Sequence, residues 1–219
     1  MKKLRIGVIL SDVNVPVWVA RMLEQIRDSS NAKIIVLAFI GHPKIDKFVD
    51  RLPELRLQLD NAFIHSDPSP WEQCDVRTVI PNAPLLNGDP RKWNLLLKTA
   101  DLDIFLNLSQ DNLDESLLHA AHYGIWSLRS NNKLVTTSTV PSWLDLKRNG
   151  PIIHCVVEAQ RGLSVQVVAS AVLPANCFSF MKDQKTLLWR ASSLVPEAIK
   201  QLYLNGESKF FAYSELTLN

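Results

Sequence analysis

Four side chains in the second half of the chain have types and spacings that suit chemistry on a small polar molecule. Ser127 and Arg129 stand two positions apart in the segment Gly124-Ile125-Trp126-Ser127-Leu128-Arg129. His154 and Glu158 stand four positions apart in a β-branched run, and residues at even spacing share one face of a strand. Either His154 or Glu158 can accept a proton, whereas Ser127 can donate a hydrogen bond. For His154, packing within the strand pair is the alternative interpretation.

Asn131 and Trp143 are further candidates for contact with a ligand. Asn131 follows the Ser127 segment and can offer its amide to a carbonyl group, although paired asparagines in a polar stretch also form turns. The indole of Trp143 can stack on a pterin or a sugar, or it can pack between a helix and a sheet. Both residues therefore keep a structural interpretation beside the functional one.

Neither a metal site nor a dinucleotide site is predicted. His119 and His122 have a helical metal-binding spacing, but no carboxylate or third histidine stands at ligand spacing. Cys74, Cys155 and Cys177 are odd in number and lack CxxC spacing, which favours a reducing cytoplasm over a disulfide framework. The sequence also lacks G-x-G-x-x-G after its first expected strand, so it does not predict NAD or FAD binding in the Rossmann mode.

Composition and charge argue against two classes of partner. The chain has 219 residues and 47% of them are hydrophobic, which is enough for one core without metals or crosslinks. With 24 Lys and Arg against 22 Asp and Glu, the net charge of +2 is too small to imply a nucleic-acid partner. The apolar stretch from Ile6 to Leu10 is too short to span a bilayer, so no membrane partner is expected.

The elements that must position these side chains alternate between strands and helices. Buried strands are indicated by four apolar, β-branched runs, at 4–10, 33–40, 101–108 and 124–128. Helical periodicity follows Pro16 and is also indicated at 44–59, 91–99 and 113–122. This order predicts an α/β fold with a Rossmann-like, open and mostly parallel sheet and helices on both faces.

The remaining segments are expected to be less regular. Between 60 and 90 the prolines leave room for at most one short strand, Val76 to Ile80. The polar stretch 130–139 is expected to be a loop. The runs 152–158 and 165–173 predict an antiparallel hairpin.

The end of the chain is predicted to be helical. The helix is expected to begin near Phe178 and to resume at Pro196. One domain is expected to span 1–205, followed by a C-terminal tail at 206–219.

Three segments carry a resemblance to a known family. They are Val15-Pro16-Val17-Trp18, Tyr123-Gly124-Ile125-Trp126-Ser127 and Leu188-Trp189-Arg190-Ala191-Ser192-Ser193. With the order of elements, they resemble the amino-terminal domain of the folate-dependent formyltransferases, and more specifically a divergent bacterial branch of formyltransferase-like proteins. The resemblance covers nearly the whole chain. It implies the formyltransferase fold, with a late antiparallel hairpin, a helical C-terminal tail and a cleft at the carboxyl ends of the parallel strands.

The resemblance also implies where the catalytic groups of the family would stand. Family members end a strand with Gly-x-x-Asn-x-His and carry an Asp before a Gly in the late hairpin. On this sequence the three positions are occupied by Ser127, Arg129 and Arg161. Because a guanidinium keeps its proton at neutral pH, general-base chemistry by the family route is not expected.

Two functions remain open. The first is a formyltransferase-like protein of a bacterial biosynthetic pathway, resembling enzymes that move a formyl group from 10-formyltetrahydrofolate to an amine, with that activity lost or altered. The second is a non-catalytic anion-binding or scaffold protein whose cleft takes a small molecule or a partner protein. The resemblance implies that Arg129 and Arg161 face each other, which would suit a phosphate or carboxylate, unless both are ordinary solvated arginines.

Overall fold

β1 (Leu4–Leu10) lies inside the sheet because nearly all of its side chains are apolar and buried. The computed structural model describes residues 2–40, 69–88, 93–109, 113, 117–139, 141, 150–175 and 179–216. Within these residues β1 pairs in parallel with β3 (Ala32–Phe39) on one side and β6 (Ile104–Asn107) on the other. β1 is therefore an interior strand, with strands of the sheet on both sides.

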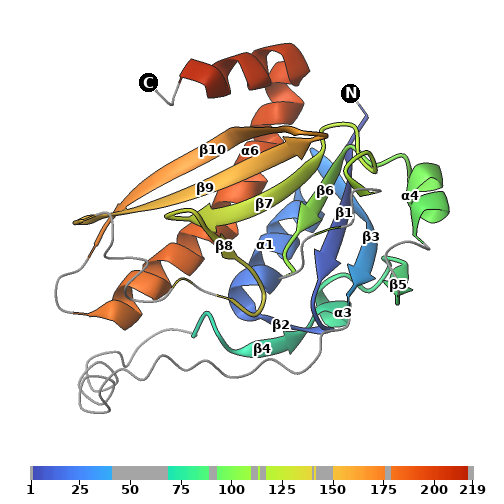
Figure 1. Cartoon of the computed structure of the whole chain (residues 1–219). Helices are drawn as coiled ribbons and strands as arrows, with labels where there is room; N and C mark the ends of the chain where they lie inside the picture. Colours follow the sequence, from blue (N-terminus) through green and yellow to red (C-terminus); the bar gives the residue numbers. More distant parts are fainter. Residues whose placement is uncertain are drawn as a thin grey trace.

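Eight strands of the described residues form one mixed sheet, in the order β10-β9-β7-β6-β1-β3-β5, with β8 paired to β7. Figure 1 shows how this sheet is arranged relative to the helices. β5 (Leu85–Asn87) and β7 (Ile125–Ser130) extend its parallel part. β8 (Lys133–Val135), β9 (Ile152–Arg161) and β10 (Ser164–Pro174) run antiparallel to their neighbours. β2 (Asn14–Pro16) and β4 (Gln73–Asp75) form a separate two-stranded sheet.

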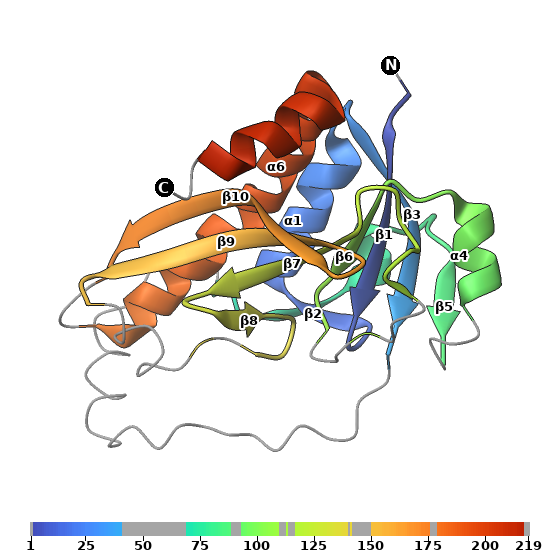
Figure 2. The ribbon, with the colours of Figure 1, turned by 45° about the horizontal axis from the view of Figure 1, so that its top comes forward.

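Helices cover the two faces of the large sheet unequally. α1 (Val17–Asp28) and α6 (Phe180–Leu216) pack against each other on one face, which Figure 2 shows behind β9 and β10. α4 (Asn94–Ala100) lies on the other face near β1 and β3. The strands alternate to match, since Val8 packs toward α1 and α6 whereas Ile9 packs with Trp93 and Leu97 beside α4.

α6 continues through Pro196, where sequence reasoning expected a fresh start. A proline inside a helix leaves the carbonyl of the residue four positions earlier without its backbone donor. That carbonyl belongs to Ser192, and the side-chain amide of Gln25 on α1 donates to it at 3.4 Å. The backbone leaves the helical region only at Gly206, with φ 72 and ψ 170, so α6 bends at the position where the tail was expected to begin.

The predicted fold class is confirmed, including the parallel strands, the late hairpin and the C-terminal helix. The strand expected from Val76 to Ile80 is wrong, because Val76–Val79 form the short helix α3. Asp75 caps this helix, accepting a hydrogen bond from the backbone N–H of Arg77 at 2.8 Å. Two short strands that were not expected, β4 and β5, flank it.

Two further expectations need correction, and a third concerns residues that the structure does not describe. The stretch expected as a loop after Arg129 contains β8, and Asn131 and Asn132 form the turn before it, with φ of 47° and 67°. The helix expected up to His122 is not formed at 117–123, where the chain turns and Leu102 bridges Ala121. The helix expected at 44–59 lies outside the described residues.

Candidate functional site

Asn107, Ser127 and Glu158 form a row across three neighbouring strands. The last residue of β6, Asn107, is the register partner of Ser127 on β7, and Ser127 is in turn the partner of Glu158 on β9. Register partners point to the same face and their strands lie about 4.8 Å apart, so an amide, a hydroxyl and a carboxylate stand side by side. The face is the one that carries α4, since Ile125 and Phe105 next to this row pack there.

The carboxamide of Asn107 is held in one orientation. Its Oδ1 accepts two hydrogen bonds from Ser109, one from the backbone N–H at 3.0 Å and one from the hydroxyl at 2.8 Å. A backbone N–H can only donate, which fixes the oxygen on that side and turns the NH2 group away. Within the described part of the chain the structure shows no acceptor for that NH2 group. The amide is therefore oriented so that it can donate to a carbonyl oxygen of a ligand.

Glu158 is paired with Arg129 across β7 and β9. The Nε atom of Arg129 lies 2.6 Å from Oε2 of Glu158, and the two side chains are 38% and 22% exposed. The N–H bond does not point along this contact, because Nε is among the buried atoms without a hydrogen bond, so we describe the pair as ionic. A second nitrogen of the guanidinium, Nη1, donates to the backbone oxygen of Asn132 at 3.3 Å. The positive charge of Arg129 is thus compensated within the chain.

A cluster of hydroxyl groups lies beside the row, at the carboxyl ends of β1 and β6. The hydroxyl of Thr137 lies 3.0 Å from the hydroxyl of Ser11 and 3.2 Å from the backbone oxygen of Leu108. Because β3 and β5 lie on one side of β1 and β6 and β7 on the other, the chain reverses its direction of winding here. Open α/β sheets bind ligands in the crevice at such a point. The Asn107 row and the Ser11 hydroxyl cluster therefore occupy the expected place for a binding site.

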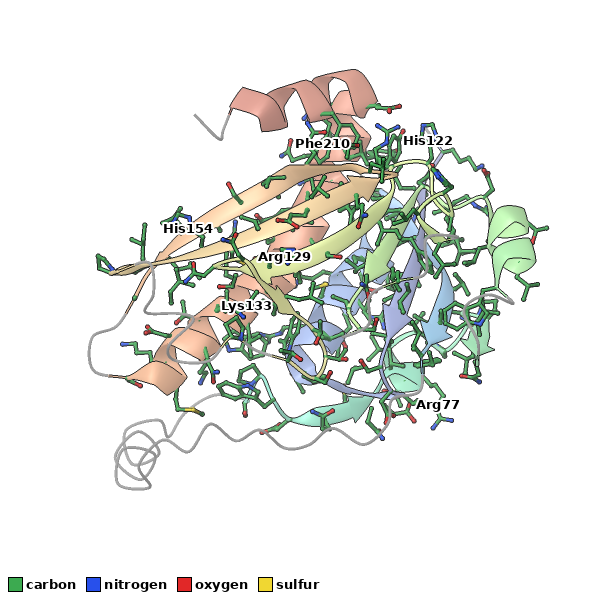
Figure 3. All side chains as sticks on the ribbon, in the orientation of Figure 1. Arg77, His122, Arg129, Lys133, His154 and Phe210 are labelled. Carbon is green, nitrogen blue, oxygen red and sulfur yellow. The ribbon has the colours of Figure 1, made fainter. Side chains whose placement is uncertain are left out.

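His154 and Glu158 share a face of β9, as the spacing predicted, because the residues between them alternate toward the core. They are four positions apart on a strand, which is about 13 Å. The backbone of His154 serves the β7–β8 turn: its N–H donates to Oδ1 of Asn131 at 3.1 Å, and its oxygen accepts from the N–H of Asn131 at 3.3 Å. These contacts fit the turn interpretation of Asn131. Figure 3 labels Arg129 and His154, which lie on the neighbouring strands β7 and β9.

Arg129 and Arg161 do not converge, which corrects the expectation drawn from the resemblance. β7 and β9 are antiparallel, so Arg161 lies beside Gly124 at the start of β7 while Arg129 lies near its end. The Nη2 atom of Arg161 is 2.9 Å from a carboxylate oxygen of Glu207, and its guanidinium lies 5.2 Å from the centre of the Phe211 ring. Each arginine has its own carboxylate, and the pair cannot clamp one anion.

Trp143 lies outside the described residues. Among the described residues, no group of three or more His, Cys, Asp or Glu side chains is placed to hold a metal ion. No helix in the described ranges is both long and apolar enough to cross a membrane. Asn107 and Ser109 were missed as site residues, although two polar residues that interrupt and follow the end of an apolar strand are a detectable signal.

Comparison with known proteins shows the fold. The sequence matches no protein-family model and no curated protein sequence. Among solved structures, glycinamide ribonucleotide transformylase 1 from Symbiobacterium toebii is similar over 93% of this chain and 89% of its own, with 16% identity and a TM-score of 0.57. Phosphoribosylglycinamide formyltransferase from Anaplasma phagocytophilum is similar over 93% of this chain and 89% of its own, with 15% identity and a TM-score of 0.59.

A third solved structure points the same way. A formyltetrahydrofolate deformylase from Pseudomonas putida KT2440 is similar over 90% of this chain and 64% of its own, with 6% identity and a TM-score of 0.53. At these identities the likeness speaks for architecture. With the strand order and the late hairpin described above, it shows that this chain has the formyltransferase fold.

Proposed function

We propose that this chain binds a small molecule with a formyl or other carbonyl group at the Asn107 row, and that the transfer of that group to an amine is lost or altered. The observation that carries the proposal is the orientation of Asn107, whose oxygen is held by Ser109 and whose NH2 group has no acceptor among the described residues. A preoriented donor binds a carbonyl oxygen without first breaking a bond of its own.

A formylated folate is the ligand class we propose. The resemblance found in the sequence implies 10-formyltetrahydrofolate, and the fold is shared with formyltetrahydrofolate deformylases and phosphoribosylglycinamide formyltransferases. In this chain the polarising amide would come from Asn107 on β6 rather than from the family position on β7, where Ser127 stands. The two residues are register partners, so the amide is displaced by one strand only.

We propose lost or altered transfer because the reaction needs a proton acceptor. Moving a formyl group to an amine requires a group that takes a proton from the attacking nitrogen. The family positions carry Arg129 and Arg161, and a guanidinium has no lone pair suited to accepting that proton. Glu158 is the carboxylate next to Ser127, and it is already engaged by Arg129. His154 is about 13 Å from Glu158 along β9.

A second candidate function is a non-catalytic protein that uses the same cleft for an anionic molecule or a partner chain. Arg129 supports it, because its side chain is 38% exposed beside the row and can meet an anion that competes with Glu158. The setting we propose for either function is a bacterial biosynthetic pathway in the cytoplasm. The resemblance supports the pathway, and the widely spaced free cysteines Cys74 and Cys155 support the compartment.

The test is calorimetric titration with 5-formyltetrahydrofolate, a stable formylated folate. Wild-type protein should bind it, and Asn107→Asp, which keeps the shape but removes the NH2 donor, should weaken binding at least about tenfold. Asn205→Asp makes the same change at an exposed position on α6 and should leave affinity unchanged. Absence of binding to the wild-type protein would refute the proposed ligand. Equal affinity of Asn107→Asp and wild type would refute the proposed site.

The same protein, supplied with 10-formyltetrahydrofolate as the formyl donor, decides between lost transfer and the family reaction. We expect no formyl transfer to an amine such as phosphoribosylglycinamide at rates near those of an intact formyltransferase. A rate in that range would show that the proton has an acceptor that the Asn107 row does not provide.

A further inference from the structure

A groove of about 800 Å³ runs between β10 and α6, on the face of the sheet opposite the Asn107 row. Its β10 side is formed by Val168, Ala169 and Ser170. Its α6 side combines apolar and charged side chains, among them Arg190, Leu194, Glu197, Ala198, Lys200 and Phe210. The groove is independent of the proposed carbonyl-binding site, since none of the residues of that row lines it.

The strand along this groove forms an edge of the sheet. β10 stands at the end of the strand order in the described residues, and Figure 2 shows it at the outer margin of the sheet, passing in front of α6. Its 11 residues include no charged side chain, and Val165 and Val172 are 58% and 60% exposed. Natural proteins usually protect such an edge with charged side chains, prolines or bulges. In β10 these are limited to a bulge at Val168 and to Pro174 at its end, so two uncharged stretches, 164–167 and 169–173, border the edge. An uncharged edge of this length that borders a groove is suited to accepting another strand.

The charges of the groove favour an acidic occupant. Glu197 is bound within α6 by a bidentate pair with Arg190, at 2.7 Å and 2.9 Å, so these two charges compensate each other. Lys200 adds a positive charge to the same rim. Leu194 and Ala198, which are almost fully buried, give the floor its apolar character. An occupant that alternates acidic and apolar side chains would match both features.

We propose that the groove between β10 and α6 binds an extended acidic segment of another protein, which adds to the sheet as a further strand beside β10. Backbone hydrogen bonds to the edge of β10 supply the affinity, and alternate side chains of the segment meet Leu194 on the floor and Lys200 on the rim. A second copy of this chain is a poorer occupant, because its β10 carries no acidic residue to offer to Lys200.

Fluorescence polarisation with a short labelled peptide of alternating glutamate and valine tests the proposal. The wild-type protein should bind this peptide, and should bind a peptide of alternating lysine and valine at least about fivefold more weakly. Lys200→Glu should weaken binding of the acidic peptide by about fivefold, in line with an exposed ion pair. Lys182→Glu makes the same change at an exposed position of α6 outside the groove and should leave binding unchanged.

Hydrogen exchange measured with and without the peptide shows whether a strand is added. Amide protection should rise in β10, between Val165 and Val172, and stay constant in β1. Three results would overturn the proposal: no binding of the acidic peptide up to about 1 mM, equal binding of the lysine peptide, or binding without new protection in β10. Self-association of the protein with the same protection of β10 would overturn it in favour of a second copy as the occupant.

Discussion

Nε of Arg129 lies 2.6 Å from Oε2 of Glu158, and this pair spans β7 and β9 two register positions apart. Arg129 stands where the resemblance places the catalytic histidine, and Glu158 is the register partner of Ser127, which stands at the place of the asparagine. The positive charge of Arg129 is therefore met by a carboxylate from the neighbouring strand. The ion pair links β7 to β9 at this end of the sheet.

Removing the carboxylate of Glu158 should show how much the ion pair contributes to the free energy of unfolding. Glu158→Gln leaves Arg129 half-buried without its counter-charge, and we expect the free energy of unfolding to fall by about 1 kcal/mol, because both side chains are partly exposed and solvent screens them. Urea denaturation measures the change. Asp101→Asn removes the carboxylate of the far more exposed Lys2–Asp101 pair and should leave stability unchanged. Equal effects of the two substitutions would contradict this reading of the pair.

Gly124 is required by its conformation and by its neighbours. Its φ is 79°, and a Cβ built on it would overlap the carbonyl oxygen of Gln160 on β9. Gly124→Ala should therefore destabilise the protein by about 3 kcal/mol or more. Gly88 also has a positive φ, 96°, but no heavy atom lies within 4 Å of its added Cβ. Gly88→Ala should cost only about 1 kcal/mol. Thermal or urea unfolding of both variants compares the two costs, and similar costs would show that β7 and β9 move apart easily.

The order of strands and helices could be predicted from the sequence because it depends on long apolar runs. The β1 run, Leu4–Leu10, is buried on both faces as its composition indicates. Local errors arose where a short segment is decided by one polar contact. Val76–Val79 looks like a strand by β-branching, yet the side chain of Asp75 caps it as a helix.

The site could be predicted only in part, because it depends on register between strands. The sequence places Ser127 and Glu158 in different strands but does not reveal that they are partners. The unknown register also explains why Arg161 was wrongly expected to face Arg129. An alignment of the hairpin to the family assigned it a role, whereas the antiparallel register carries it to the far end of β7. Asn107 was missed because its strand was interpreted as purely structural.

The bonds between Asn107 and Ser109 should contribute to stability as well as to binding. Asn107→Ala leaves two donors of the fully buried Ser109 without an acceptor, and we expect a loss of about 2 kcal/mol. Ser109→Ala keeps the backbone donor paired with Asn107 and should cost less, about 1 kcal/mol. Urea denaturation of the two variants gives the difference. A larger loss for Ser109→Ala would mean that Asn107 is not the anchor of this pair.

Cys155 should be an inert thiol at neutral pH. Burial is the main cause that raises the pKa of its thiol from 9.0 to about 12, and the charge of Arg190 opposes the rise. Burial also raises the pKa of Cys74. In a Cys177→Ser background, iodoacetamide at pH 8 should modify Cys74 before Cys155, as mass spectrometry of the digested protein can show. Equal rates would mean that the β9 thiol is accessible.

The same shift predicts a dependence of stability on alkaline pH. The folded chain keeps the Cys155 proton up to about pH 12, whereas the unfolded chain loses it near 9.0. The contribution of the Cys155 thiol to the free energy of unfolding is therefore complete below about pH 9. It falls by about 1.4 kcal/mol per pH unit as the pH rises from there toward about 12. Cys155→Ala should remove this part of the slope. An unchanged slope in that variant would assign the alkaline loss to other groups.

The most direct test of the carbonyl-binding site is an NMR titration that follows the side-chain NH2 signals of Asn107, assigned by their absence in Asn107→Asp. On addition of 5-formyltetrahydrofolate, these signals should shift saturably with the backbone amides of Ser127 and Glu158, while the side-chain signals of Asn205 stay in place. Saturable shifts elsewhere in the chain with unmoved Asn107 signals would contradict the account, because the ligand would then bind without the amide that defines the proposed site.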